Sequence, residues 1–169
     1  MLHSRTPVLV IAGLALSSST LQAQRTSRPS QILGAVLTSL EETVSGFPEG
    51  KVRNIDLGKA TAILNTILEE PVGRSELRQA MPAGYRDMGS DSILVCPDEF
   101  RARCRIRDGG AMVSVDSIAA SQDTIQVIVT WRVNRLDARR GTEMTQWEFE
   151  LQRAGAAWKV VQKRRVRMS

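Results

Sequence analysis

Two spacings of hydrophobic residues divide the chain near residue 93. Before this point apolar residues recur every three or four positions, which is the spacing of helices that pack one face on a core. After it they alternate with polar residues, as in strands of a sheet with one buried face. This order predicts an α+β domain in which two to three N-terminal helices pack on one face of a five- to six-stranded antiparallel meander.

The first half of the chain predicts three helices. The first has a candidate N-cap at Ser30 and a stop at Gly46. The second has a candidate N-cap at Asp56 and ends at Pro71. These assignments rest on the preference of Ser and Asp for helix starts, and on the tendency of Gly and Pro to end helices. A shorter third helix is predicted over 75–81, where the next proline follows.

The second half predicts strands. Segment 124–133 carries the clearest alternation, and Thr130 and Arg132 are among its residues that are expected on the outer, polar face. A short extended piece is also expected at 51–55, with a loop over 82–92. Turn residues at 109–110 and 153–156 predict two hairpins and a register for the sheet. That register aligns two apolar rows on the buried face. The first row is Ile106, Val113, Val129, Phe149 and Val160, and the second is Cys104, Val115, Val127, Leu151 and Trp158.

The N-terminus predicts export. Arg5, an apolar run of nine residues over 8–16, and small residues up to Ala23 are typical of a secretory signal over 1–23. A membrane-spanning helix needs about 20 apolar residues, so no transmembrane span is expected after the signal is removed. We expect a flexible lead-in over 24–30, a single α+β domain over 31–169, and a periplasmic or secreted location.

The inventory of reactive side chains is small. Cys96 and Cys104 are an even pair in a chain predicted to reach an oxidising compartment, so we expect a disulfide. The only histidine, His3, leaves with the signal, which excludes histidine-based triads, dyads and zinc sites from the mature chain. No catalytic residue, metal site or cofactor is predicted. The formal net charge of +5 is modest, so no specific nucleic-acid binding is expected.

Four arginines alternate with other residues in one short segment. They are Arg101, Arg103, Arg105 and Arg107. On a strand all four would emerge on one face, where they form either an anion-binding ridge or a solvated outer face that discourages edge-to-edge aggregation. A second basic set is expected on the same outer face, at the end of the chain. It consists of Lys163, Arg165 and Arg167.

The closing strands resemble those of a known family. A strand over 147–153, a turn with glycine, and a strand over 157–161 resemble the last hairpin of the nuclear-transport-factor-2-like (polyketide-cyclase-like) superfamily. The resemblance implies a cone in which the helices and the concave face of the sheet enclose a pocket. Trp131 and Trp147, which face the buried side in the predicted register, and Tyr85 in the preceding loop are candidates for its lining. Core packing is the alternative for the tryptophans.

These observations favour a binding function over a catalytic one. The leading interpretation is an exported, non-catalytic domain that binds a small ligand or a protein partner, as a monomer or weak dimer. One alternative is an envelope module that binds anionic polymers or lipid head groups through the arginine ridge. Another is a small-molecule isomerase or hydrolase, which needs an Asp or Tyr85 beside an apolar cavity.

Overall fold

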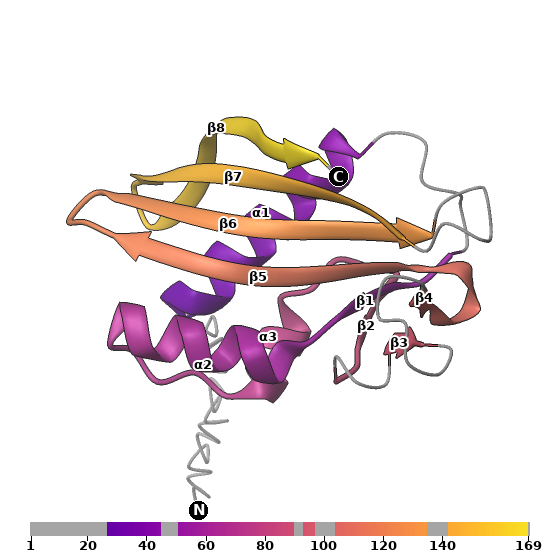
Figure 1. The fold of residues 1–169 in the computed structure, drawn as a ribbon. Helices are drawn as coiled ribbons and strands as arrows, with labels where there is room; N and C mark the ends of the chain where they lie inside the picture. Colours follow the sequence, from indigo (N-terminus) through magenta and orange to yellow (C-terminus); the bar gives the residue numbers. More distant parts are fainter. Residues whose placement is uncertain (1–26, 45–50, 90–92, 97–103, 135–141, 169) are drawn as a thin grey trace, which may run out of the picture.

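The structure is a computed structural model that describes residues 27–44, 51–89, 93–96, 104–134 and 142–168. In this part of the chain, helices precede a mixed six-stranded sheet and a small two-stranded sheet, so the α+β class is confirmed (Figure 1). The predicted signal peptide and Arg101 and Arg103 lie outside the described residues. Among the helices described, none is long and apolar enough to cross a membrane.

The three helices agree with the predicted pattern, except that the first helix begins earlier than predicted. Their bounds are α1 Arg28–Thr43, α2 Leu57–Leu68 and α3 Arg74–Gln79. Asp56 caps α2 as predicted, because its Oδ1 accepts a hydrogen bond of 3.0 Å from the backbone N–H of Lys59. The expected cap of α1 at Ser30 is wrong: Ser27 is the N-cap, and Ser30 is buried inside the helix.

Acidic side chains from distant residues explain this earlier start of α1. Glu76 accepts from the backbone N–H of Ser27 and from the Ser30 hydroxyl, each at 3.2 Å. Glu70 accepts from the backbone N–H of Arg28, also at 3.2 Å. The first N–H groups of a helix have no partner within it, and carboxylates satisfy them and complement the helix dipole. The hydrogen bonds from Ser27 and Ser30 also lower the pKa of Glu76.

The large sheet has the order β2-β1-β5-β6-β7-β8. Its four long strands form the predicted antiparallel meander, but the short β1 pairs in parallel with both β2 and β5. The expectation of a purely antiparallel sheet is therefore wrong. The helices α2 and α3 connect β1 to β2, and such a crossover returns the chain in the same direction. The bounds are β1 Arg53–Ile55, β2 Tyr85–Asp87, β5 Ala111–Ala120, β6 Thr124–Asn134, β7 Thr142–Ala154 and β8 Ala157–Met168.

The predicted inward and outward alternation is confirmed on the central strands, but the pairing is shifted. Val127 pairs with Phe149 and Val129 pairs with Trp147, so the strands β6 and β7 are offset by two residues from the predicted register. A shift of two residues keeps every side chain on its face of the sheet. The buried residues of β6 are accordingly the odd-numbered ones from Ile125 to Trp131, together with Thr130, and Val133 is partly buried.

Three bulges in the described strands change the parity that the sequence predicted. In β5 the pairing skips Asp116, so Ile118 rather than an odd-numbered residue is buried beyond it. In β8 the pairing skips Val161, so Lys163 lies opposite Phe149 and Arg165 opposite Trp147. Paired residues share a face of the sheet. These two basic residues therefore lie on the α1 side rather than on the predicted outer face. The pairing also skips Val166, so Arg167 lies opposite Gln146 on the outer face, as predicted.

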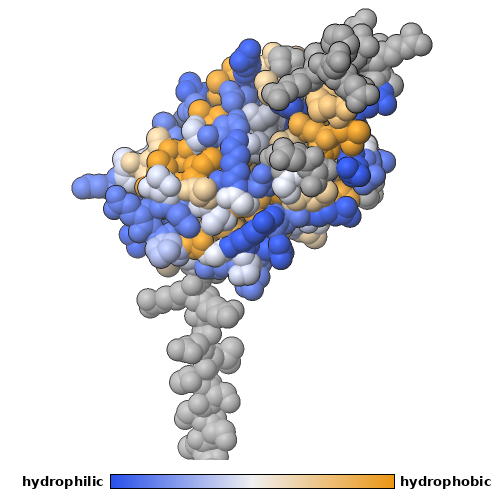
Figure 2. All heavy atoms as spheres, turned by 60° about the horizontal axis from the view of Figure 1, so that its bottom comes forward, coloured by the Kyte–Doolittle hydropathy of each residue, from blue (hydrophilic) through white to orange (hydrophobic). Residues whose placement is uncertain are grey.

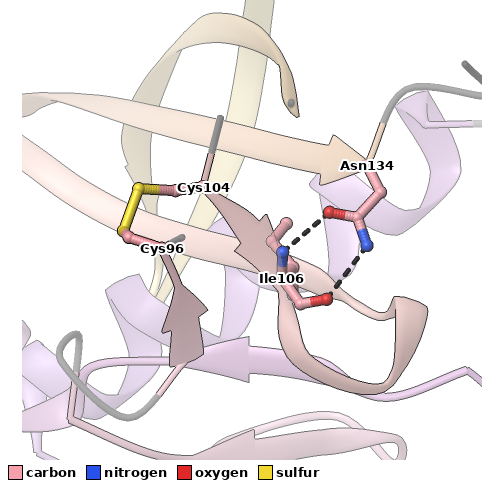
Figure 3. The surroundings of a disulfide bond; sticks show 4 residues. All are labelled: Cys96, Cys104, Ile106 and Asn134. Atoms are coloured by element: carbon pink, nitrogen blue, oxygen red, sulfur yellow. Dashed lines mark hydrogen bonds between the residues drawn. A yellow bond between two sulfur atoms is a disulfide. The ribbon is translucent and has the colours of Figure 1, made fainter. Parts of the chain in front are cut away.

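A two-stranded sheet replaces the predicted hairpin between residues 106 and 113. Its strands are β3, Leu94–Val95, and β4, Arg105–Ile106, and they pair antiparallel. A 3₁₀ turn at Arg107–Gly109 turns the chain away before β5, so Ile106 pairs with Leu94 and not with Val113. The expected disulfide between Cys96 and Cys104 is present directly beside this pair of strands (Figure 3).

Asn134 holds β4 against the end of β6. Its Oδ1 accepts from the backbone N–H of Ile106 at 2.7 Å, and its Nδ2 donates to the backbone oxygen of Ile106 at 2.9 Å (Figure 3). One side-chain amide thus makes the two bonds that a neighbouring strand would make. This contact fixes the small sheet next to the long strands.

The core lies between α1 and the sheet. Figure 1 shows α1 crossing behind the long strands, while α2 lies along the β5 edge. The side chains that meet there are almost fully buried, and they come from α1, α2 and the core-facing positions of β5, β6 and β7. The largest include Leu33, Leu37, Leu40, Leu64, Phe149 and Leu151. Protein side chains therefore fill this face of the sheet.

Candidate functional site

The structure does not bring the three predicted pocket residues together. Trp131 is buried, and Trp147 is partly buried against the same core. They are not directly opposite, because Trp131 pairs with Thr145. Tyr85 lies in β2, three strands from β6 in the sheet order. Three clefts have lining residues that all belong to the described part of the chain, and none of these clefts is lined by Tyr85, Trp131 or Trp147.

Tyr85 is better explained by packing than by chemistry. Its ring lies under the Arg53 guanidinium, with 5.8 Å between the guanidinium carbon and the ring centre. Its hydroxyl is buried and makes no hydrogen bond to any described residue. Desolvation, and next the charge of Glu41, raise the pKa of Tyr85. The phenol is thus held in its neutral form.

The arginine ridge is only half within the described residues. Arg105 is exposed in β4, opposite Val95. Arg107 is exposed in the following 3₁₀ turn, so the strand that was expected to carry all four arginines ends before it. The anion-binding role of this segment stays a prediction.

The outer face of the sheet contains a cleft of about 380 Å³. Residues on β5, β6 and β7 that alternate with the buried ones form its floor, and α2 and β3 contribute to its walls. Its lining is Lys59, Leu94, Met112, Ser114, Asp116, Thr130, Arg132 and Met144. Pockets for small molecules typically have volumes of about 300 to 1,000 Å³, so this cleft is large enough for a small ligand.

Arg132 is the most distinctive group of this cleft. The residue is partly buried. Its guanidinium donates to the Met144 sulfur at 3.6 Å, and no described carboxylate pairs with it. A thioether is a weak acceptor, whereas a guanidinium has five N–H donors in a planar fork that matches carboxylates and phosphates. Arg132 therefore has donors available for an anion that enters the cleft.

A polar network fixes the other side of the cleft. Asp116 Oδ2 accepts from the Thr130 hydroxyl at 2.5 Å and from Gln146 Nε2 at 3.0 Å. Its Oδ1 lies 3.7 Å from Lys59 Nζ, which donates to the Ser114 hydroxyl at 3.0 Å. The β5 bulge turns Asp116 into this position. The carboxylate is thus occupied by its neighbours, and it orients Lys59 at the wall of the cleft.

A second cleft, also of about 380 Å³, meets the first at Asp116. It runs between α2 and the β5 edge, and its lining is mostly apolar: Ala62, Ile63, Thr66, Ile67, Asp116, Ser117 and Ile118. Figure 2, in which the α2 side of the molecule comes forward, shows hydrophobic surface gathered in patches among hydrophilic residues. A ligand in the first cleft therefore has apolar surface close by.

A third cleft, of about 240 Å³, lies on the outer face over β6, β7 and β8. It is polar, and its lining is Gln126, Glu148, Glu150, Gln162 and Arg164. The Arg164 guanidinium is paired with the Glu148 carboxylate at 2.8 Å. Lys159 lies opposite Gln152 and Glu150 lies opposite Gln162 in this hairpin.

The most perturbed carboxylate of the described residues has a structural role. The Asp87 side chain is 2% exposed and accepts from Arg74 through both oxygens at 2.6 Å, and also from Arg78 at 2.5 Å. The hydrogen bonds from Arg74, and next from Arg78, lower the pKa of Asp87 from 3.8 to about 2. Perturbed groups often mark active sites. Here the contacts tie β2 to α3, and Asp87 lines none of the three clefts.

Sequence reasoning placed Thr130 and Arg132 correctly on the outer face of the best strand, but it did not assign them to a site. The sequence did contain an indication of the site. Arg132 lies between Thr130 and Asn134 on the polar face of the strand, and a cation among polar side chains is typical of a ligand contact. No pattern in the sequence predicted the β5 bulge that places Asp116 at the cleft. Within the described ranges, no group of three or more metal-binding side chains occurs.

Comparison with known proteins adds no identification: no family model, curated protein or solved structure matches this chain.

Proposed function

We propose that this chain is an exported, non-catalytic domain that binds a small organic anion in the outer cleft around Arg132. One observation carries the proposal: Arg132 is partly buried and lines a cleft of about 380 Å³, and among the described residues a thioether is the only hydrogen-bond partner of its guanidinium. Partly buried arginines are costly unless an anion or strong acceptors satisfy them. The bound anion would supply the strong acceptors that the described residues do not provide for Arg132.

The lining of the cleft defines the chemistry of the ligand. Arg132 and Lys59 provide positive charge, and the hydroxyls of Ser114 and Thr130 provide polar contacts. Asp116 also lines the cleft, but its carboxylate faces Lys59, Thr130 and Gln146. The rest of the lining is apolar and consists of Leu94, Met112 and Met144. Flexible methionines adapt to different ligand shapes. A carboxylate that carries a short apolar chain fits this combination.

A binding role is favoured over catalysis because the candidate base is already engaged. An isomerase or hydrolase needs a carboxylate with an available oxygen next to the substrate. Both oxygens of Asp116 face donors of the protein. Export is supported by the signal-like N-terminus and by the disulfide, which persists in oxidising compartments.

Membership of the nuclear-transport-factor-2-like superfamily is part of this proposal. Its support is the order of elements, with helices before a meander of β5 to β8, and the closing hairpin. The resemblance implies a pocket between the helices and the sheet. Because side chains fill the α1 face, we place the ligand on the opposite face.

Calorimetric titration with hexanoate tests the proposal. Loss of a charge-assisted hydrogen bond costs about 1.5 to 3 kcal/mol, so Arg132→Gln is expected to weaken hexanoate binding by about 10- to 100-fold. Arg86→Gln is the matched control, because Arg86 is exposed on β2 and lines none of these clefts. 1-Hexanol, which has the same chain length but no charge, should bind weakly to both. Equal hexanoate affinity of the wild type and Arg132→Gln would refute the site.

A further inference from the structure

The second half of β8 combines charge and hydrophobicity in a way that the cleft does not explain. Over 161–168 it contains four cations and three apolar residues, and no acidic residue. All of these residues are exposed. The exposed fractions are 53% for Val161, 48% for Val166 and 60% for Met168, which makes them three of the five large hydrophobic side chains exposed in the described chain.

The two faces of this strand differ in charge. On the outer face, Glu148 neutralises Arg164 at 2.8 Å, and Glu150 lies beside it opposite Gln162. On the other face the bulge at Val161 places Lys163 and Arg165 opposite Phe149 and Trp147. No described carboxylate pairs with either cation, and Arg165 donates to the Met168 sulfur at 3.7 Å.

Trp147 and Met168 complete this face. Trp147 is partly buried and pairs with Arg165, and Met168 pairs with Thr145 on the same side of the sheet. Tryptophan side chains and basic residues are enriched where proteins meet the membrane interface. The edge of the sheet thus presents an amphipathic surface, which we call the β8 surface. It consists of Trp147, Lys163, Arg165 and Met168, together with the exposed Val166, which the second β8 bulge leaves without a pairing partner.

Edge protection alone does not account for the β8 surface. Basic residues and bulges on an edge strand prevent pairing with other chains. Three exposed apolar side chains on the same edge work against that purpose. A nucleic acid or another polyanion would satisfy the charges, but it offers aliphatic side chains no apolar environment. Anionic lipids satisfy both, since their head groups attract cations and the interface accepts apolar side chains.

We propose that the β8 surface docks the domain on a membrane that contains anionic lipids. The positive charges of Lys163 and Arg165 provide the selectivity for anionic over neutral lipids. The side chains of Val166 and Met168 enter the interface between the head groups. This proposal is independent of the ligand cleft, which lies on the outer face of the sheet. Failure of hexanoate binding would therefore leave it standing, and the reverse also holds.

Co-sedimentation with vesicles tests the docking. Vesicles of phosphatidylglycerol and phosphatidylcholine are compared with vesicles of phosphatidylcholine alone. Each basic residue near an anionic surface contributes roughly a fivefold gain in affinity, so Lys163→Gln with Arg165→Gln should weaken binding about 30-fold. Lys51→Gln with Arg86→Gln is the control, because it removes the same charge from two exposed residues outside the β8 surface. Arg86 lies on the opposite edge strand β2, and Lys51 lies just before β1. The wild type and all variants have the same N-terminal segment, so any vesicle binding by that segment is equal in all of them. A difference in vesicle binding between variants therefore comes from the substituted residues.

A second pair of variants separates lipid from polyanion. Val166→Ser with Met168→Ser should weaken vesicle binding while retention on a heparin column stays unchanged. Equal binding of the wild type to both kinds of vesicle would overturn the proposal. An equal loss of vesicle affinity in the Lys163 and Arg165 variant and in the Lys51 and Arg86 control would also overturn it. Unchanged vesicle binding by the serine variants would also overturn it, and would assign the surface to polyanions.

Discussion

The long strands and the short strands of this protein are held in place by different forces. The strands β5 to β8 have 10 to 13 residues. The strands β5, β6 and β7 bury apolar side chains against the helices, and β8 adds Trp158 to the core. The strands β1 to β4 have two or three residues each. Such short strands cannot pair stably alone. Individual polar contacts fix them, including Asn134 with Ile106 and Asp87 with Arg74, and so does the disulfide.

This difference matters for function because the outer cleft lies where the two regions meet. Met112, Thr130 and Arg132 come from the long strands, and Leu94 comes from β3. The long strands supply a rigid floor, and the short ones supply a wall that depends on a few specific contacts. Variants that act on one region and not on the other can test this division.

The largest effect is expected from breaking the core of the long strands. Phe149→Ala removes a fully buried aromatic side chain and should lower the free energy of unfolding by about 3 to 5 kcal/mol. Gln126→Ala, an exposed outer-face residue of β6, should change it by less than about 0.5 kcal/mol. Urea unfolding followed by tryptophan fluorescence measures both. A small loss for Phe149→Ala would show that packing does not dominate this region.

A smaller, pH-dependent effect is expected from the short strands. The folded pKa of Asp87 is about 2, below its ordinary value of 3.8, so its contribution is complete above pH 4 and is lost as the pH falls toward 2. Since Arg74 and Arg78 are half exposed, we expect Asp87→Asn to cost about 2 kcal/mol at pH 7. The cost should shrink toward zero at pH 2. Urea unfolding at several pH values tests this, and a cost independent of pH would contradict the ion-pair explanation.

The same division separates what the sequence revealed from what it did not. Alternation in 124–133 predicted the buried face of β6, and apolar spacing predicted α1 and α2, because a continuous core imposes a periodic pattern. The parallel strand β1 and the bulges at Asp116 and Val161 leave no periodic trace. Contacts such as Glu76 with Ser27 join residues 49 positions apart, so local reasoning misses them.

For the candidate site, the sequence supplied the parts but not the arrangement. Thr130 and Arg132 were predicted on the outer face, whereas the pocket was expected on the buried one. The aromatic residues Trp131 and Trp147 pack into the core instead. Lys59 reaches the site from a helix, and its contact with Ser114 depends on how α2 sits along β5.

Asn134→Ala should sharpen the comparison further. It removes both hydrogen bonds to the Ile106 backbone and is expected to cost about 1 to 2 kcal/mol. Hydrogen exchange at the Ile106 amide should accelerate strongly, while amides in the middle of β6 keep their protection. Equal acceleration at both places would mean that the two regions unfold as one unit.

The smallest effect is expected at Tyr85. Tyr85→Phe removes a buried hydroxyl that lacks a partner among the described residues, so stability should stay equal or rise by up to about 1 kcal/mol. Thermal unfolding measures the change. A loss of stability would show that the hydroxyl makes a bond that this explanation omits.

NMR titration of the ¹⁵N-labelled protein with hexanoate tests the central claim most directly, namely that the outer face of the sheet binds an organic anion. We predict saturable shift changes at the backbone amides of the cleft, chiefly Met112, Ser114, Thr130, Arg132 and Met144. Changes centred on Leu37, Val129 and Phe149 would instead place the ligand between α1 and the sheet, and would contradict the claim.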